Sequence, residues 1–317
     1  MGRAWSVDAP VFLVGSERSG STLLSHMLDH HPHVAWCGGF EFAVEFLQQK
    51  GQWPRLRDYC RALEIDIIFQ RSGFTVDASL SYPELMRDFL VQQRNRYGKE
   101  LVGATVHLYF DRLPWIFPSC RFIHLLRDGR DVSRSRVAMG WDGNMWTAAE
   151  HWVVAEQLWD RLQAQLCPDQ WHEVRYESLI RAPEAELREI CNFLGVPYSP
   201  HMLHYPDNTA YTPPDPKLIG QWERSLSPVE IQLAEAQMID MLRARGYRPS
   251  GLAPLHVGWQ YAQWLREHDR YRRLRFRIQR YGWSLAAADV LARRLHLNFW
   301  ARRLQRRLNA ITWQYFK

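Results

Sequence analysis

A short segment rich in glycine and serine is suited to holding an anion. It runs Gly15-Ser-Glu-Arg18-Ser-Gly20-Ser-Thr22 and follows the apolar run 11–14. Backbone N–H groups in such a loop point inward, and a helix that begins after the loop adds partial positive charge. The spacing nearly matches the P-loop pattern, with Thr22 at the hydroxyl position. Ser21 stands where nucleotide triphosphatases need Lys, and the cation comes earlier, at Arg18. The segment therefore indicates a phosphate-like group held without the usual lysine and magnesium.

Arg127 and Ser135 form a second candidate anion site. Arg127 follows the predicted strand 121–126, and Ser135 comes eight residues later on a predicted helix. An Arg at a strand end and a hydroxyl on the next helix can converge on one oxyanion, through charge-assisted hydrogen bonds. The alternative is a solvated turn in which the charged residues 128, 130 and 131 pair with one another. Two anion-binding turns on one sheet favour a ligand with two separated anionic groups.

A sheet is needed to bring these two segments together. The hydrophobic patterns and stop signals predict strands at 11–15, 101–106, 121–126 and 171–176, and helices at 19–31, 82–97, 131–139, 144–166, 183–194 and 228–245. Strands that alternate with helices indicate an α/β fold with a mostly parallel central sheet flanked by helices. Ligands of such sheets bind beyond the carboxyl ends of the strands, where the first segment would lie.

Composition excludes several classes of protein. The 317 residues are 46% hydrophobic, enough for one large domain, and the five cysteines show no regular spacing. We expect no metal, because no His/Cys/Asp cluster has ligand spacing. We see neither a signal peptide nor a run of about 18 apolar residues, so we expect a cytoplasmic protein. The proline-rich stretch 205–220 is expected to be a surface loop that could act as a lid.

Positive charge is concentrated at one end of the chain. The net charge is +6, but residues 255–317 carry 13 Arg and one Lys against three acids. We therefore predict an α/β domain over residues 1–250 and a basic, Trp- and Arg-rich helical extension over 251–317. The extension suits packing on the main domain or on a second subunit (a homo-oligomer), or peripheral contact with an anionic membrane. An anionic polymer is a third alternative, and nucleic acid is disfavoured because the main domain is mildly acidic.

Four motifs, in order, resemble those of the sulfotransferase family. Residues 15–24 resemble the 5′-phosphosulfate loop of enzymes that use 3′-phosphoadenosine-5′-phosphosulfate (PAPS), and residues 127–135 resemble their 3′-phosphate motif. The stretches 172–197, with Arg175-Tyr-Glu177 and Phe193-Leu-Gly195, and 219–228 are similar to two later family segments. The resemblance covers about residues 10–250. It is closest to the group of tyrosylprotein, carbohydrate and bacterial sulfotransferases.

The resemblance implies an activity and its donor-binding residues. The 5′-phosphosulfate would be held by Arg18, Ser19, Gly20, Ser21 and Thr22, the 3′-phosphate by Arg127 and Ser135, and the adenine or phosphate would lie near Tyr176. Sulfonate would pass in line from PAPS to an acceptor hydroxyl or amine of a small molecule, glycan, lipid or peptide, without a metal. The alternatives are an atypical P-loop kinase, disfavoured by Ser21, and a non-catalytic nucleotide-binding module tethered by the basic extension.

Two residues are candidates for the general base. Glu41 falls close to the catalytic Glu of tyrosylprotein-type enzymes, although a one-residue insertion is needed to align it, and we favour it slightly. His107 falls where cytosolic sulfotransferases carry a catalytic His. The pKa of a free histidine suits the task, whereas a Glu needs burial to raise its pKa. Either residue also fits a purely structural role. Thr105 stands in place of a family Lys, which leaves open what supplies that charge.

Overall fold

The chain forms two compact units in the computed structural model, which describes residues 9–209, 212–294 and 298–313. The first unit comprises the described residues up to Arg127 together with Val154–Ile219. The second comprises Asp128–Val153 and the described residues from Gly220 onward. The domain boundary expected near residue 250 stays a prediction.

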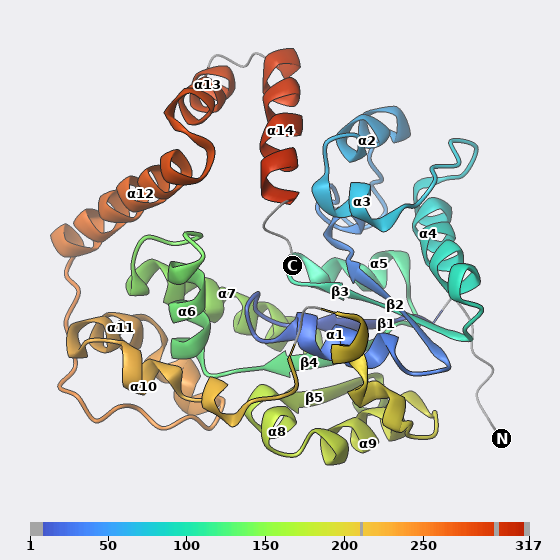
Figure 1. Cartoon of the computed structure of the whole chain (residues 1–317), viewed down its shortest axis with the longest axis horizontal. Helices are drawn as coiled ribbons and strands as arrows, with labels where there is room; N and C mark the ends of the chain where they lie inside the picture. The colour runs from blue at the N-terminus through green and yellow to red at the C-terminus, as the bar shows by residue number, and fades with distance from the viewer. Residues whose placement is uncertain (1–8, 210–211, 295–297, 314–317) are drawn as a thin grey trace. The chain divides into compact units, whose positions relative to one another are not determined.

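The described residues of the first unit include a parallel five-stranded sheet, in the order β2-β3-β1-β4-β5 (Figure 1). The strands are β1 (Val11–Val14), β2 (Val34–Gly39), β3 (Leu101–Val106), β4 (Arg121–Leu126) and β5 (Trp171–Arg175). Each neighbouring pair runs parallel. Parallel strands are covered on both faces, which is why β1, β3 and β4 are buried along their whole length. The predicted α/β fold with a mostly parallel sheet is confirmed.

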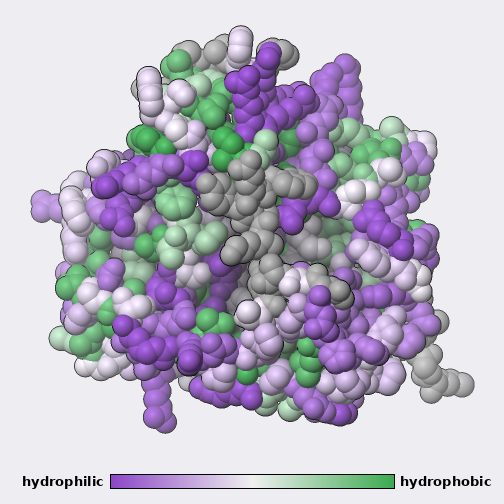
Figure 2. Space-filling model, viewed as in Figure 1, coloured by the Kyte–Doolittle hydropathy of each residue, from purple (hydrophilic) through white to green (hydrophobic). Residues whose placement is uncertain are grey.

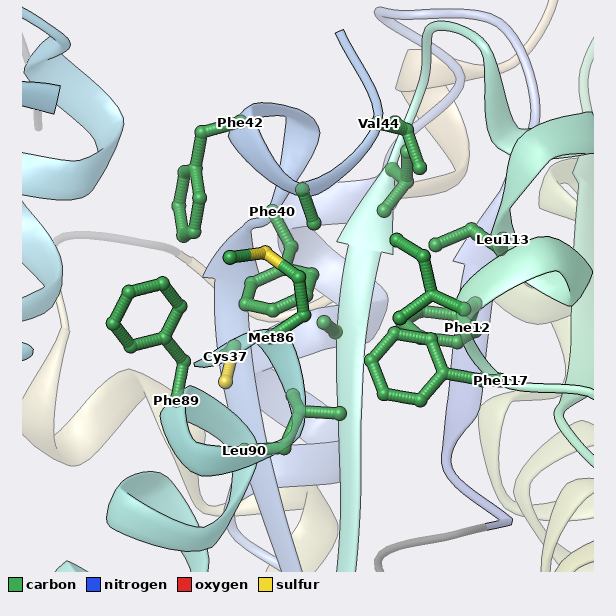
Figure 3. Close-up of a cluster of buried hydrophobic side chains, with 14 of the residues drawn as sticks. Phe12, Cys37, Phe40, Phe42, Val44, Met86, Phe89, Leu90, Leu113 and Phe117 are labelled. Atoms are coloured by element: carbon green, nitrogen blue, oxygen red, sulfur yellow. The ribbon is translucent and has the colours of Figure 1, made fainter. Parts of the chain in front are cut away.

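Alternate side chains of β1 enter two hydrophobic cores on opposite faces of the sheet. Phe12 and Val14 pack with residues of α2, α3, α4 and α5, and Val11 and Leu13 pack with residues of α1, α8 and α9. Figure 3 shows part of the first core, where Phe12 and Phe117 have ring centroids 5.4 Å apart. The alternation follows from the two-residue period of a strand.

Capping residues predict the bounds of two helices of the first unit, and α1 is shorter than the predicted helix 19–31. The helices of this unit are α1 (Ser21–Asp29), α2 (Leu56–Leu63), α3 (Ile67–Ser72), α4 (Tyr82–Tyr97), α5 (Leu113–Ile116), α8 (Tyr176–Arg181) and α9 (Pro183–Leu194). The predicted bounds of α4 and α9 are met to the residue. Ser81 and Glu84 form a capping box before α4, and Gly98 and Gly195 end the two helices in the left-handed conformation.

The second unit is helical. It contains α6 (Gly129–Ala138), the first half of α7 (Met145–Gln163), α10 (Gln221–Ser225), α11 (Pro228–Ala244), α12 (Trp259–Tyr281), α13 (Trp283–Arg294) and α14 (Asn298–Trp313). Helix α6 packs closely on its neighbours, since a Cβ atom on Gly129 would lie 2.6 Å from the Trp152 ring and 2.8 Å from the Met238 sulfur. The helical C-terminal part that composition predicted is therefore present. Among the described helices, none is long and apolar enough to span a membrane.

The sequence patterns missed strand β2, as well as helices α2, α3, α8 and α10. The end of β2, Cys37-Gly38-Gly39, has low strand propensity, but pairing with β3 overrides it. Trp36 lies opposite Gly103, where a Cβ atom would be 2.2 Å from the indole, so the Trp ring occupies the space that glycine leaves open. The register shifts between Cys37 and Gly39, which pair with Ala104 and Thr105 respectively. Gly38 is thus an extra residue, a bulge that re-aims the chain after it.

Candidate active site

The loop between β1 and α1 has the backbone of an anion cradle. Gly15 and Gly20 have φ of 139° and 98°, and Arg18, which is not glycine, has φ of 71°. A Cβ on Gly15 would lie 2.5 Å from the Leu125 carbonyl oxygen, so only glycine allows this close approach to β4. Left-handed backbone at a non-glycine residue costs roughly 1–2 kcal/mol, and such strain collects at functional sites.

Ser19 adds a polar group that no neighbour uses. The residue is 1% exposed, and its Oγ has no hydrogen-bond partner within the described part of the chain. A buried hydroxyl without a partner is costly, roughly 1–3 kcal/mol, so a ligand that accepts its proton would remove the cost. Ser19 comes directly before Gly20, the N-cap of α1. The hydroxyl, the left-handed backbone and the helix start therefore lie in one short segment.

Arg127 is positioned by this loop and by Tyr176. Its Nη1 donates to the Arg18 carbonyl oxygen (3.3 Å), and its Nη2 donates to the Leu218 carbonyl oxygen (3.0 Å). The guanidinium carbon lies 4.0 Å from the centroid of the Tyr176 ring, a cation–π geometry. A Cβ on Gly20 would lie 2.4 Å from the same ring. Tyr176, 4% exposed at the start of α8, is thus a platform beneath both the loop and Arg127.

The remaining charged residues of the second motif lie in the second unit. Arg130 is 2% exposed, donates to both carboxylate oxygens of Asp128 (3.0 and 2.7 Å), and binds Glu235 at 2.8 Å. Asp131 accepts the backbone N–H groups of Gly220 and Trp222. Asp128 and Arg130 therefore pair as the alternative interpretation expected, but buried rather than solvated, and Asp131 binds backbone N–H groups. Ser135, on α6, is partly exposed.

Strand register brings the two candidate bases together. Gly39 of β2 pairs with Thr105 of β3, and the two strands are parallel. Glu41 and His107 each come two residues after this pair, so they lie side by side. The backbone N–H of His107 donates to Glu41 Oε1 at 3.2 Å. Without the extra residue Gly38, the chain would present a different side chain here.

His107 uses both ring nitrogens on the donor loop. Its Nδ1 lies 3.0 Å from the Gly15 carbonyl oxygen and its Nε2 lies 3.0 Å from Ser21 Oγ. A carbonyl oxygen only accepts, so Nδ1 carries a proton, and in the neutral ring Nε2 accepts from the Ser21 hydroxyl. The lone pair that a catalytic base needs is then occupied.

Glu41 lies in an environment that raises the pKa of its carboxyl group. Burial raises the pKa of Glu41, and the neighbouring His107 partly opposes the rise. Its Oε2 atom is shielded from solvent and accepts no hydrogen bond from the residues that the structure describes. A Cβ on Gly39 would lie 2.7 Å from this oxygen, so glycine leaves it room. A carboxyl group with a raised pKa and an unused oxygen is suited to taking a proton near neutral pH.

Thr105 supplies no charge and has a structural role. It is 5% exposed, its Oγ1 lies 2.8 Å from Ser25 Oγ, and it accepts the Trp36 indole N–H at 3.1 Å. The hydroxyl therefore ties α1 and β2 to β3. Ser25 and Leu218 are partners that sequence reasoning missed, and nothing in their local patterns distinguishes them from ordinary helix and loop residues.

Comparisons with known proteins agree with this geometry. A family model described as "Sulfotransferase family" matches residues 10–200. Protein-tyrosine sulfotransferase A of Caenorhabditis elegans is 27% identical over 207 residues, covering 62% of this chain and 52% of the relative. Protein-tyrosine sulfotransferase of Drosophila melanogaster is 25% identical over 275 residues, covering 77% and 52% respectively. The chain thus spans about half the length of these two relatives.

Solved structures agree on the fold. The sulfotransferase domain from the curacin biosynthetic pathway superposes with a TM-score of 0.52 at 20% identity, covering 76% of this chain and 98% of that domain. The sulfotransferase domain of a Synechococcus olefin synthase has a TM-score of 0.50 at 21% identity, covering 74% and 97%. The order of motifs, the parallel sheet and the match over residues 10–200 lead to one conclusion: the chain belongs to the sulfotransferase family.

Proposed function

We propose that this protein transfers a sulfonate group from PAPS to an acceptor hydroxyl or amine. The observation that carries the proposal is the set of contacts made by His107. Its ring binds Gly15 and Ser21 in the donor loop, and its backbone N–H binds Glu41. One residue thus couples the segment that would hold the donor to the carboxylate that would receive the acceptor's proton.

The donor loop fits a 5′-phosphosulfate. Ser19 provides a hydroxyl group, Arg18 provides a cation, and the start of α1 at Gly20 and Ser21 provides backbone N–H groups. The unpartnered Ser19 hydroxyl supports a bound acceptor of hydrogen bonds at this point. In this proposal Arg18 stabilises the negative charge that grows on the 5′-phosphate as its bond to sulfur breaks.

The 3′-phosphate is assigned to Arg127, and the part of Ser135 in holding it stays a prediction from the sequence motif. Arg127 is 8% exposed and is held by Tyr176 and two carbonyl oxygens, which pre-orders its guanidinium and reduces the entropy lost on binding. Its fixed place beside the backbone of the donor loop suits a ligand with two anionic groups on one nucleoside.

Glu41 is the proposed general base. The acceptor oxygen forms a bond to sulfur, the bond from sulfur to the 5′-phosphate oxygen breaks, and the acceptor's proton passes to Glu41. The products are the sulfated acceptor and 3′,5′-adenosine bisphosphate. His107 is the positioning residue, because it aligns Glu41 with the donor loop while its own nitrogens remain bound.

A tyrosine hydroxyl is the first acceptor to test, because several relatives are named protein-tyrosine sulfotransferases. Glycan, lipid and small-molecule hydroxyls or amines are the other arms of an acceptor screen with sulfur-labelled PAPS, read by mass spectrometry. A cytoplasmic location stays a prediction.

Calorimetric titration of the whole chain with three nucleotides tests the donor assignment. We expect tight binding of 3′,5′-adenosine bisphosphate, weaker binding of adenosine 5′-phosphate, and no preference for ATP with Mg²⁺. Preference for ATP with Mg²⁺ would instead support the P-loop kinase alternative. Failure to bind any of the three would contradict a nucleotide site altogether. Unfolding midpoints measured with each ligand check the ranking independently, since a ligand that binds only the folded state stabilises it.

A further inference from the structure

Helix α12 packs on the rest of the second unit through a face that carries two buried residues. Leu265 and Asp269 are buried, and Asp269 Oδ1 accepts from the Gly143 backbone N–H (2.6 Å) and from the Thr147 hydroxyl (3.0 Å). Further along the helix, Phe276 packs against Gly140, where a Cβ atom would lie 2.3 Å from its ring. Residues 265, 269 and 276 follow helical spacing, so this is the inward face.

Another face of α12 carries an exposed apolar stripe. Its members are Trp264 (56% exposed), Tyr271 (60%), Leu274 (43%) and Ile278 (38%). They are spaced by seven, three and four residues, which places them along one side of a helix. Large apolar side chains exposed singly need no explanation, but four on one side of a helix indicate a surface that meets a partner.

Basic residues flank this stripe. Helix α12 contains seven Arg against two acids, and Arg272 and Arg275 are exposed. Arg270, Arg273 and Arg277 form ion pairs with acids on α12 and α13. The partner that complements such a face is therefore both apolar and anionic.

The pattern continues beyond α12. Trp283 and Leu291 on α13 and Trp300 on α14 are 74%, 57% and 57% exposed. Exposed Arg residues accompany them on α14, at 302, 303, 306 and 307. Figure 2 shows hydrophilic residues (purple) beside hydrophobic ones (green) over these helices.

We propose that α12 binds the surface of an anionic lipid bilayer, with the stripe in the headgroup region and the flanking Arg on lipid phosphates and carboxylates. A row of Trp, Tyr, Leu and Ile between Arg residues is the composition of a helix that lies in a membrane interface. A second copy of this chain fits less well, because it would bring two Arg-rich faces together. A single-stranded nucleic acid fits less well because Leu274 and Ile278 offer no ring on which a base can stack.

Vesicle flotation with the full-length protein tests this surface. The probes are vesicles of phosphatidylcholine alone and of phosphatidylcholine with phosphatidylserine. We expect binding to the anionic vesicles only, and loss of most binding when salt is raised from about 0.1 M to about 1 M, where screening is strong. Equal binding to both vesicle types, or no binding to either, overturns the proposal.

Two variants separate the apolar and the charged contributions. Replacing Tyr271, Leu274 and Ile278 by Ser should weaken partitioning at least about tenfold. Arg272→Gln with Arg275→Gln should weaken it roughly tenfold to thirtyfold, and the corresponding Lys variants should restore it, since each cation near the surface contributes similarly. Arg57→Gln with Arg243→Gln, two exposed Arg outside α12, is the charge-matched control and should bind as wild type.

Unfolding midpoints guard against misfolded variants, and the Lys rescue keeps the test decisive if the Ser variant unfolds. Unchanged partitioning of both variants overturns the assignment to α12. Two other results would assign the surface to a different partner and also overturn the proposal. One is binding of a thymidine oligonucleotide without binding of vesicles. The other is a dimer in sedimentation that the Ser substitutions abolish, again without binding of vesicles.

Discussion

Replacing Glu41 and His107 separately distinguishes a base from a residue that positions it. Glu41→Gln keeps the size of the side chain but removes the proton acceptor. Losing a general base lowers the chemical step by about 10²–10⁴. Affinity for 3′,5′-adenosine bisphosphate should be retained, because Glu41 has no hydrogen bond to the donor loop except through His107 within the described residues.

His107 variants should behave differently. His107→Ala removes two side-chain hydrogen bonds, to Gly15 and Ser21. At about 0.5–1.5 kcal/mol each, the loss is roughly 1–3 kcal/mol, or about fivefold to 150-fold, and part of it should fall on donor affinity. His107→Gln places an amide within reach of Ser21 and should recover much of the loss, although an amide cannot act as a base.

The assay is single-turnover transfer at saturating donor across pH, with donor affinity measured in parallel. Because the pKa of Glu41 is raised, the wild-type rate should rise with pH through that raised value, and this limb should vanish in Glu41→Gln. Glu45→Gln, which removes an exposed carboxyl four residues away, is the matched control and should act as wild type. Wild-type turnover by Glu41→Gln, together with a His107→Gln variant as inactive as His107→Ala, would refute the assignment and make His107 the base.

The same carboxyl group should reduce stability at neutral pH. The unfolded chain releases the Glu41 proton near the ordinary value of 4.5, whereas the folded protein holds it to higher pH. The unfolded state therefore binds fewer protons in this interval, and the free energy of unfolding falls as pH rises through it. At pH values above the raised pKa of Glu41, the Glu41→Gln variant should unfold at a higher midpoint than wild type. Below pH 4.5 the two midpoints should be the same. A destabilised variant at neutral pH would show that the carboxylate is stabilised by the fold.

Three further substitutions probe the donor site. Arg18→Ala should abolish detectable transfer, with a loss of about 10²–10³ or more in the chemical step and weakened but measurable nucleotide binding, and near-normal turnover would remove Arg18 from the mechanism. Arg127→Ala and Ser135→Ala should each weaken the binding of 3′,5′-adenosine bisphosphate in calorimetric titration, by roughly 1.5–3 kcal/mol for Arg127→Ala. The binding of adenosine 5′-phosphate should be nearly unaffected. Equal loss of binding for both ligands would contradict the 3′ assignment. Gly20→Ala should lower the unfolding midpoint and donor affinity together, because a Cβ there would lie 2.4 Å from the Tyr176 ring. The left-handed backbone at this position also costs a non-glycine residue about 1–2 kcal/mol. Wild-type behaviour of the variant would show that the loop relaxes freely.

Local patterns were sufficient for most of the elements and for the family. Capping residues predicted α4 and α9 to the residue, and largely hydrophobic segments predicted β3 and β4, because caps and strand burial are encoded within a few neighbouring positions. The motif order 15–24, 127–135, 172–197 and 219–228 was enough to recognise a sulfotransferase, and the family match over residues 10–200 confirms it. The roles of individual site residues stay predictions.

Only the tertiary structure decided how Glu41 and His107 relate to each other. They are 66 residues apart, and their meeting depends on the pairing of β2 with β3, a non-local contact, and on one bulged residue, Gly38. Neither strand register nor a bulge is encoded in a local period, because the free energy that selects them comes from side chains on the other strand, such as Trp36 over Gly103. The sequence by itself therefore predicted which residues could do the chemistry, and the pairing of two distant strands decided that the backbone of one candidate base binds the carboxylate of the other.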